Sequence, residues 1–265
     1  MVDPAEPKPG SAAWWTRRGL DADRPRRRRV DGLTLDRILD AALEIVDADG
    51  LDGLTMRRLA ARLGCGHASL YRHVASHDEV LVLLLDRVLG APILAPADQG
   101  TPRHRAESAL RRYRGLLLEH PALTPAFLDG QLLGPNALAR REEALALLLD
   151  AQVPTTLAVR AYLTLTHFVI SSAAFEASGA ARTAQDRREM EAYFSSLPDG
   201  EHPVLRAVAV ELNAVDGDDE FELGLHALLD HMERLAAEVA WDAGDAERAG
   251  SQAAALDAAG LSPKR

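Results

Sequence analysis

The chain has 265 residues, of which 47% are hydrophobic, 5% aromatic and 26% charged, and its formal net charge is −10. This length suffices for one large core or for a small domain joined to a larger one. A single cysteine, Cys65, excludes a disulfide framework and fits a reducing cytoplasm. The chain contains no uninterrupted run of about 18 apolar residues, so we expect no membrane span. Alanine and leucine dominate and β-branched runs are scarce, so we expect an all-α protein.

The first 32 residues are rich in proline, glycine, aspartate and arginine, which predicts a disordered basic arm over residues 1–32. Five of the six positions from 24 to 29 are arginine. This basic run is compatible with a solvated tail. Because it directly precedes the first predicted helix, it is equally compatible with an arm that contacts DNA phosphates or the minor groove.

Four short helices follow, and three of them have a recognisable start. Thr34 and Thr55 are N-cap residues, Gly64 ends the second helix, and Ser76 with Glu79 forms a capping box that opens the fourth. The expected helices are residues 35–48, 56–63, 67–74 and 76–89.

Beyond these, proline repeatedly stands at the first position of a helical run, as at Pro102, Pro125 and Pro135. The expected helices are residues 102–119, 125–131, 136–150, 155–179, 184–196 and 218–240, and residues 203–213 are compatible with one more. The helix at 155–179 is apolar on nearly all sides, so we expect burial all round. From about Trp241 the chain is expected to fray.

The block from residue 53 to residue 77 has the features of a DNA-binding unit. It contains four arginines, three histidines and no acidic residue, although the chain as a whole is acidic. DNA affinity depends on local cationic contact with phosphates and not on net charge. Two short helices separated by a glycine turn are the outline of a helix-turn-helix. The expected buried set is Leu59, Leu63, Leu70 and Val74.

The order and spacing of these residues resemble the TetR family of transcriptional regulators. The resemblance rests on Gly53-Leu54-Thr55-Met56-Arg57-Arg58-Leu59-Ala60, on Leu63-Gly64 and on Leu70-Tyr71-Arg72-His73-Val74. It implies a three-helix DNA-binding domain, a connecting fourth helix and a dimeric protein. By matching position, it implies phosphate contacts from Thr55, Tyr71 and His73, and base-edge contacts from Arg57, His67, Ala68 and Ser69.

Several of these positions leave alternatives open. The family often has a phosphate-anchoring lysine at the start of the fourth helix, where this chain has His77, so that contact is weaker, pH-dependent or replaced by Arg72. Tyr71 is also compatible with a core aromatic, and His73 with a surface histidine. Cys65 fits packing in the turn better than redox sensing.

The last long helix carries an apolar seam whose members are spaced alternately by four and three residues. They are Phe221, Leu225, Leu228, Met232, Leu235 and Val239. The stretch 218–230, with His202-Pro203-Val204-Leu205 upstream, resembles the tetracycline-repressor-like C-terminal domain. That resemblance implies a four-helix bundle across a two-fold axis, so we expect a homodimer with these six residues as contacts; the alternative is a monomer core.

A ligand pocket is implied among the helices that start near residues 102, 136 and 155. Its candidate lining residues, each also compatible with ordinary core, are Leu116, Phe127, Leu132, Leu147, Tyr162, Thr166, His167 and Phe168. We expect no cofactor and no metal. A row on one helical face, Glu222, His226 and Asp230, leaves a metal-binding enzyme as a rival interpretation.

These features together predict a cytoplasmic, homodimeric repressor that a small-molecule ligand releases from a palindromic operator in double-stranded DNA. The expected parts are a disordered arm (1–32), a helix-turn-helix domain (33–80), a ligand-binding and dimerisation domain (81–240) and a flexible tail (241–265). A ligand-independent regulator, an activator and a helical protein that does not bind DNA are the alternatives. No catalytic motif is present in the sequence, so we expect no enzyme.

Overall fold

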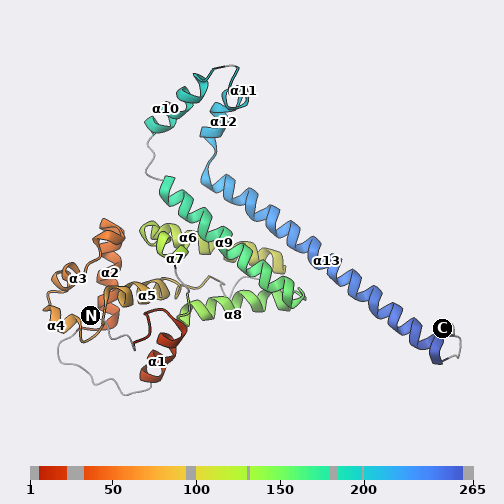
Figure 1. Cartoon of the computed structure of the whole chain (residues 1–265), viewed down its shortest axis with the longest axis horizontal. Coiled ribbons are helices and arrows are strands. Elements are labelled where there is room, and N and C mark those ends of the chain that lie inside the picture. Colours follow the sequence, from red (N-terminus) through yellow and green to blue (C-terminus); the bar gives the residue numbers. More distant parts are fainter. Residues whose placement is uncertain are drawn as a thin grey trace.

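The computed structural model describes residues 6–22, 33–93, 100–129, 132–179, 184–198 and 200–258, and in these ranges the secondary structure is entirely helical (Figure 1). The all-α prediction is confirmed. The α-helices are α1 (Ala12–Ala22), α2 (Leu35–Asp49), α3 (Met56–Arg62), α4 (His67–Leu70), α5 (His77–Val88), α6 (Pro102–Glu119), α7 (Thr124–Asp129), α8 (Pro135–Asp150), α9 (Thr155–Gly179), α10 (Ala184–Ser195), α11 (Pro203–Ala207), α12 (Ala209–Ala214) and α13 (Gly217–Ala258). Two short 3₁₀ helices, η1 (Leu51–Gly53) and η2 (Pro121–Leu123), lie between them.

Helices α2, α3 and α4 form a small N-terminal unit whose starts are set by local capping. The Thr34 hydroxyl accepts a hydrogen bond from the backbone N–H of Arg37, and the Thr55 hydroxyl from that of Arg58, each at 3.2 Å. Helix α4 ends at Leu70, earlier than predicted. The chain then continues in hydrogen-bonded turns to Val74, in which some bonds have the tighter i to i+3 spacing.

Helix α5 joins this unit to the rest of the molecule. The Ser76 hydroxyl caps it by accepting from the N–H of Glu79 at 3.1 Å, as predicted, while the Glu79 carboxylate accepts from the N–H of Ala75 at 2.7 Å. Helix α5 packs against α2 on one side and against α8 on the other. A boundary placed at residue 80 therefore falls inside a helix that both parts share.

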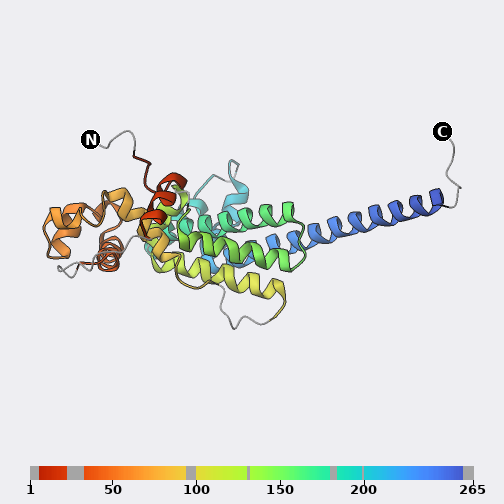
Figure 2. The same cartoon turned by 90° about the horizontal axis from the view of Figure 1, so that it is seen from below.

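Helix α9 is the centre of the C-terminal part, in contact with α6, α7, α8 and α13 (Figures 1 and 2). Over Thr155–Ser178 it is long and apolar enough to cross a membrane by length and composition alone, which the sequence analysis did not anticipate. Its position among four other helices identifies it as a core helix. Within the single chain, however, α9 is not buried all round, because Val159, Leu163 and Phe175 are 43%, 46% and 73% exposed.

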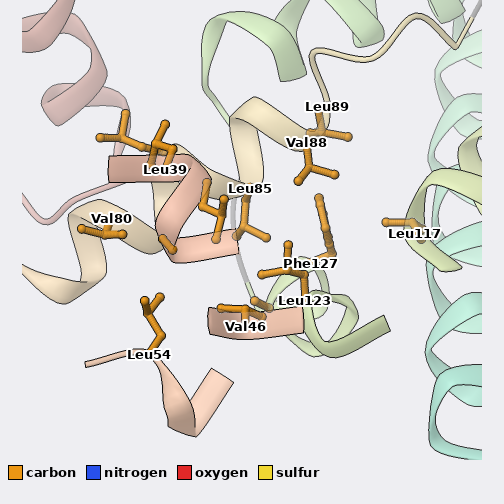
Figure 3. Close-up of a cluster of buried hydrophobic side chains, with 14 of the residues drawn as sticks. Leu39, Val46, Leu54, Val80, Leu85, Val88, Leu89, Leu117, Leu123 and Phe127 are labelled. Carbon is orange, nitrogen blue, oxygen red and sulfur yellow. The ribbon is translucent and has the colours of Figure 1, made fainter. Parts of the chain in front are cut away.

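One continuous hydrophobic core runs from the N-terminal unit into the C-terminal part. At the junction, Val46 of α2 lies near Leu123 and Phe127, while Leu85 and Val88 of α5 approach from the other side (Figure 3). All five side chains are buried. The two parts are therefore packed together at this junction and cannot move without disturbing shared core contacts.

Residues 12–22 contradict the expected disordered arm, because they form helix α1. Half-buried Trp14 and Trp15 pack against the hydrophobic core, and Arg18 lies over the Trp14 ring, 5.1 Å from its centroid. Arg18 also forms an ion pair with Glu79 of α5. Tertiary contacts thus order a segment whose composition alone suggested disorder. The arginine run from 24 to 29 lies outside the described residues.

The predicted fraying from Trp241 was also wrong over residues 241–258. Helix α13 continues to Ala258 and projects well past the other helices (Figure 2). This segment is rich in alanine and contains no proline, so helix propensity is high enough to continue it.

Candidate nucleic-acid interface and ligand cavity

The turn between α3 and α4 fixes the helix-turn-helix. Gly64 adopts φ +64°, a left-handed conformation that glycine adopts without strain. Its N–H donates to the carbonyl of Ala61 at 3.2 Å, and the N–H of Cys65 donates to that of Ala60 at 3.0 Å, which ends α3 in a Schellman motif. The predicted buried residues Leu59, Leu70 and Val74 are 0–1% exposed, while Leu63 is half-buried.

The residues predicted to contact DNA lie on the outer surface of this unit. Exposed side chains are those of Thr55, Arg57, His67, Ala68, Tyr71 and Arg72, and those of Ser69, His73 and His77 are half-buried. Tyr71 is 48% exposed, which excludes the core-aromatic alternative. Its ring lies 6.4 Å from that of His67, so the two form one edge of this surface.

The arginines of α3 differ in what they contact. Arg58 pairs with Asp49, and Arg62 with Glu44, both acids of α2. Within the described ranges, Arg57 has neither a hydrogen bond nor an ion pair. It is therefore the α3 cation that an incoming phosphate or base would meet without first breaking an ion pair.

Two side chains next to the turn are already engaged within the unit. The Arg72 guanidinium donates to the Ser69 hydroxyl at 2.9 Å, which holds its side chain alongside α4. His77 is the first residue of α5, and its Nδ1 lies 3.4 Å from a carboxylate oxygen of Asp78. This acid would compete with a phosphate for the imidazole.

A polar link between α5 and α8 was not predicted. The carboxylate of Asp86 on α5 accepts from the backbone N–H groups of Asn136 and Ala137 at 3.1 and 3.0 Å, and so caps α8. The Asn136 amide returns a bond to the Asp86 carbonyl at 3.0 Å. Burial raises the pKa of Asp86 above its ordinary value, while these hydrogen bonds act in the opposite direction.

A cavity of about 1040 Å³ lies between α6, α8 and α9, with Leu89 and Ile93 at the end of α5 on its wall. Six predicted lining residues belong to it: Phe127, Leu132, Leu147, Tyr162, Thr166 and His167. Leu116 and Phe168 do not line it. Leu116 packs at the edge of the core, and the Phe168 ring stacks on that of Phe221 with centroids 5.4 Å apart. The helical pattern identified the right helices but could not say which face of each meets the cavity.

The cavity wall also carries polar groups that the sequence analysis missed, namely Tyr113, Arg140, Arg141 and Glu143. Burial, with a smaller effect of Tyr162, raises the pKa of Tyr113, so its hydroxyl stays neutral at ordinary pH. These residues lie on α6 and α8 at positions that look like solvated helix faces in sequence. Only the packing of α9 against both helices brings them together.

Two of the six predicted dimer contacts face the chain's own interior, so the assignment was wrong for them. Phe221 and Leu225 are 1% and 0% exposed in the single chain, because α13 packs against α9. Leu228, Met232 and Leu235 are half-buried, and for Val239 only the backbone is described. The 3.5-residue seam is real, but its first part serves the monomer core.

The charged row on α13 is an ion-pair seam with α6. Arg111 donates to both carboxylate oxygens of Glu222, at 2.6 and 2.7 Å, and thereby holds the pKa of Glu222 below its ordinary value. Asp230 pairs with Arg103 at 2.6 Å. Among the described residues no cluster of histidine, cysteine and acidic side chains suits a metal ion. The metal-enzyme alternative thus finds no support in this row.

Comparisons with known proteins cover both parts of the chain. Residues 38–83 match the family described as bacterial regulatory proteins, tetR family, and residues 95–236 match the tetracyclin repressor-like C-terminal domain. The HTH-type transcriptional repressor DrrR1 of Streptomyces coeruleorubidus is 35% identical over 225 residues, which is 81% of this chain and 83% of that protein.

Solved structures of TetR family proteins also match this chain. Apo ActR from Streptomyces coelicolor matches with a TM-score of 0.71 and 35% identity, over 78% of this chain and 98% of that one. ActR in complex with actinorhodin matches with a TM-score of 0.70 and 35% identity, over 77% and 98%. Because two family domains match and a repressor is 35% identical over 81% of the chain, this chain belongs to the TetR family of bacterial transcriptional regulators.

Proposed function

We propose that this chain is a homodimeric repressor that binds a palindromic operator through α3 and α4 and leaves it when a small molecule fills the cavity. Regulators of this family bind DNA operators and small-molecule ligands, and they are transcription factors and not enzymes. Their DNA partner implies a cytoplasmic location. The proposed parts are residues 33–80 for DNA binding and 81–240 for ligand binding and dimerisation, with α5 spanning the boundary.

The shared position of α5 carries this proposal. The helix packs on α2 beneath the helix-turn-helix, and its Asp86 caps α8, a wall of the cavity. Leu89, which follows α5, lines the cavity directly. A ligand that shifts α8 therefore shifts α5 and with it the spacing of the two DNA-reading units. Differential affinity of only about 1–3 kcal/mol between the two arrangements changes DNA binding 5–150-fold.

The proposed DNA contacts follow from exposure and chemistry. We assign base-edge contacts to Arg57, His67, Ala68 and Ser69, and phosphate contacts to Thr55, Tyr71, Arg72, His73 and His77. Residues 53–77, which carry all of these positions, contain no acidic residue, and this suits a groove lined by phosphates. Two copies would place these surfaces about 34 Å apart, one turn of DNA.

The proposed dimer surface lies on the exposed apolar faces of α9 and α13. Phe175 on α9 is 73% exposed and Leu223 on α13 is 74% exposed. Val159 and Leu163 of α9 are also exposed, but they line the cavity. Because these two helices contact each other, one partner copy can cover both faces. Phe175→Asp should convert the dimer to monomer in sedimentation analysis, whereas Leu138→Asp, at an exposed leucine on α8, should leave it dimeric. Dimeric Phe175→Asp protein would refute this surface.

The decisive experiment for the function is a gel shift with the DNA upstream of the chain's own gene, at stated salt, because phosphate contacts make affinity salt-dependent. We expect a retarded complex that a cavity ligand dissolves. Actinorhodin, present in a solved ActR complex, is the first compound to add. Failure to bind this DNA even at low salt would contradict the repressor function. Binding that no cavity ligand changes would favour a ligand-independent regulator.

A further inference from the structure

The charged side chains on the cavity wall are Arg140, Arg141 and Glu143, all from α8. Arg140 donates to Glu143 at 2.8 Å, so these two form an ion pair. Most of the remaining wall is aliphatic or aromatic. Among these three side chains, the charges of Arg140 and Glu143 balance each other, and the positive charge of Arg141 is left over.

Arg141 contacts neutral oxygen atoms. Its Nε donates to the Tyr162 hydroxyl at 3.2 Å, and its Nη2 donates to the backbone carbonyl of Leu132 at 3.5 Å. The guanidinium lies 5.9 Å from the centroid of the Tyr162 ring. In the part of the chain that the structure describes, no carboxylate pairs with it. These contacts hold the guanidinium in place but leave its charge without a counter-ion.

An uncompensated cation beside apolar side chains favours an anion more strongly than a cation in water does, because the local dielectric is low. A guanidinium also binds an oxyanion through two parallel N–H donors. The cavity volume lies at the upper end of the roughly 300–1,000 Å³ range of drug-sized ligand sites.

We propose that the ligand of this cavity is an organic anion, in which a large apolar body fills the space between α6, α8 and α9 and an acidic group pairs with Arg141. This inference rests on the proposed function, and it specifies the chemistry of the ligand. Next to Arg141, Arg140 Nε and Glu143 Oε2 are buried without hydrogen-bond partners. A ligand that carries further polar groups near its acidic group would satisfy them.

Two fluorescent probes with the same apolar body test the charge requirement: 8-anilinonaphthalene-1-sulfonate, an anion, and N-phenyl-1-naphthylamine, its neutral counterpart. Both are titrated into the full-length protein. We expect Arg141→Gln to weaken binding of the sulfonate by about 10-fold or more, the usual effect of losing a hydrogen bond to a charged group. Binding of the neutral probe should change less than about 3-fold, since its apolar contacts remain.

Two further variants complete the design. Arg141→Lys keeps the charge and should retain most of the sulfonate affinity. Arg160→Gln removes an exposed cation of α9 that is not on the cavity wall, and should affect neither probe. Retained binding of the neutral probe by Arg141→Gln shows that the cavity is intact.

Three results would overturn the anion proposal. If Arg141→Gln weakens both probes equally, or neither, the charge is irrelevant, while the cavity and the proposed function stand. If Arg160→Gln weakens the sulfonate as much as Arg141→Gln does, the anion binds at the surface. If the wild-type protein binds neither probe, the cavity does not take ligands of this size, and ligand-controlled release fails together with the anion proposal.

Discussion

The carboxylate of Asp86 on α5 accepts a hydrogen bond from the backbone N–H of Ala137 on α8 at 3.0 Å, across 51 positions of sequence. The two residues join the helix beneath the DNA-reading unit to a helix that lines the cavity. Gly134 permits this approach, because a Cβ at that position would lie 2.1 Å from an Asp86 carboxylate oxygen. The link therefore depends on an acid in one helix and on the absence of a side chain in the turn before the other.

Asp86→Ala tests this link. The substitution leaves the N–H groups of half-buried Asn136 and buried Ala137, at the start of α8, without their acceptor, so we expect the free energy of unfolding to fall by about 1–3 kcal/mol. Urea unfolding of the wild type and the variant at one fixed protein concentration measures this loss. Asp78→Ala removes an exposed acid from the first turn of α5 and should cost less. Equal losses would show that Asp86 acts only as a surface charge.

The docking of α1 gives a second prediction. Arg18 pairs with Glu79, which is only 6% exposed, so Arg18→Gln leaves a buried carboxylate without its cation. We expect a loss of about 1–3 kcal/mol in stability and faster proteolysis within α1. Arg17→Gln is the matched control, because Arg17 is exposed and lies 4.0 Å from Glu6. An Arg18 variant as stable and as protease-resistant as the Arg17 variant would contradict the docked position of α1.

The features that the sequence predicted well are those whose chemistry is local. Thr34, Thr55 and Ser76 were predicted as caps from their residue type, and each hydroxyl accepts a hydrogen bond from the backbone N–H three residues later. The left-handed turn at Gly64 depends on one residue type in the same way. For such features, the sequence contains both partners within one helical turn.

The features that escaped prediction depend on partners far apart in sequence. Helix α1 is held by an ion pair between residues 61 positions apart, and α8 is capped by an acid 50 positions earlier. Phe221 was assigned to the dimer because its spacing shows an apolar stripe without saying what covers it. In the fold, Phe168 stacks on it from the same chain. Spacing identifies a face, but the tertiary structure decides its partner.

The Arg111–Glu222 pair gives a pH prediction. The pKa of Glu222 is lowered in the folded state, so its stabilising contribution is present above the unfolded-state pKa and is lost as the pH falls through the folded-state pKa. The wild type should therefore be more stable than Glu222→Gln at pH 7, and the difference should shrink as the pH falls below the ordinary value of 4.5. Because the side chains of Arg111 and Glu222 are both more than a third exposed, we expect the difference in the free energy of unfolding to be at most about 1 kcal/mol.

Urea unfolding of both proteins between pH 7 and pH 3.5 measures this difference. Glu220→Gln, at an exposed acid in the first turn of the same helix, corrects for the interaction with the helix dipole. A difference between wild type and Glu222→Gln that grows as the pH falls would mean that Arg111 does not stabilise the carboxylate.

The last prediction separates the reading of DNA from the folding of the unit that reads it. Arg57 and Arg62 both lie on α3, but Arg62 pairs with Glu44 of α2, whereas Arg57 points outward without a partner within the described ranges. Arg57→Gln should weaken binding to the upstream promoter by about 1–3 kcal/mol and relax its sequence preference. Fluorescence anisotropy at two salt concentrations, with specific and scrambled duplexes, measures both effects.

Arg62→Gln removes the same charge from the same helix and serves as the control. Because this arginine is already neutralised by Glu44, its loss should lower stability slightly and promoter affinity less than the loss of Arg57 does. If both variants weakened specific and scrambled duplexes equally, the two arginines would contribute only general charge. In that case α3 would not approach the bases at Arg57, and sequence reading would have to come from α4 alone.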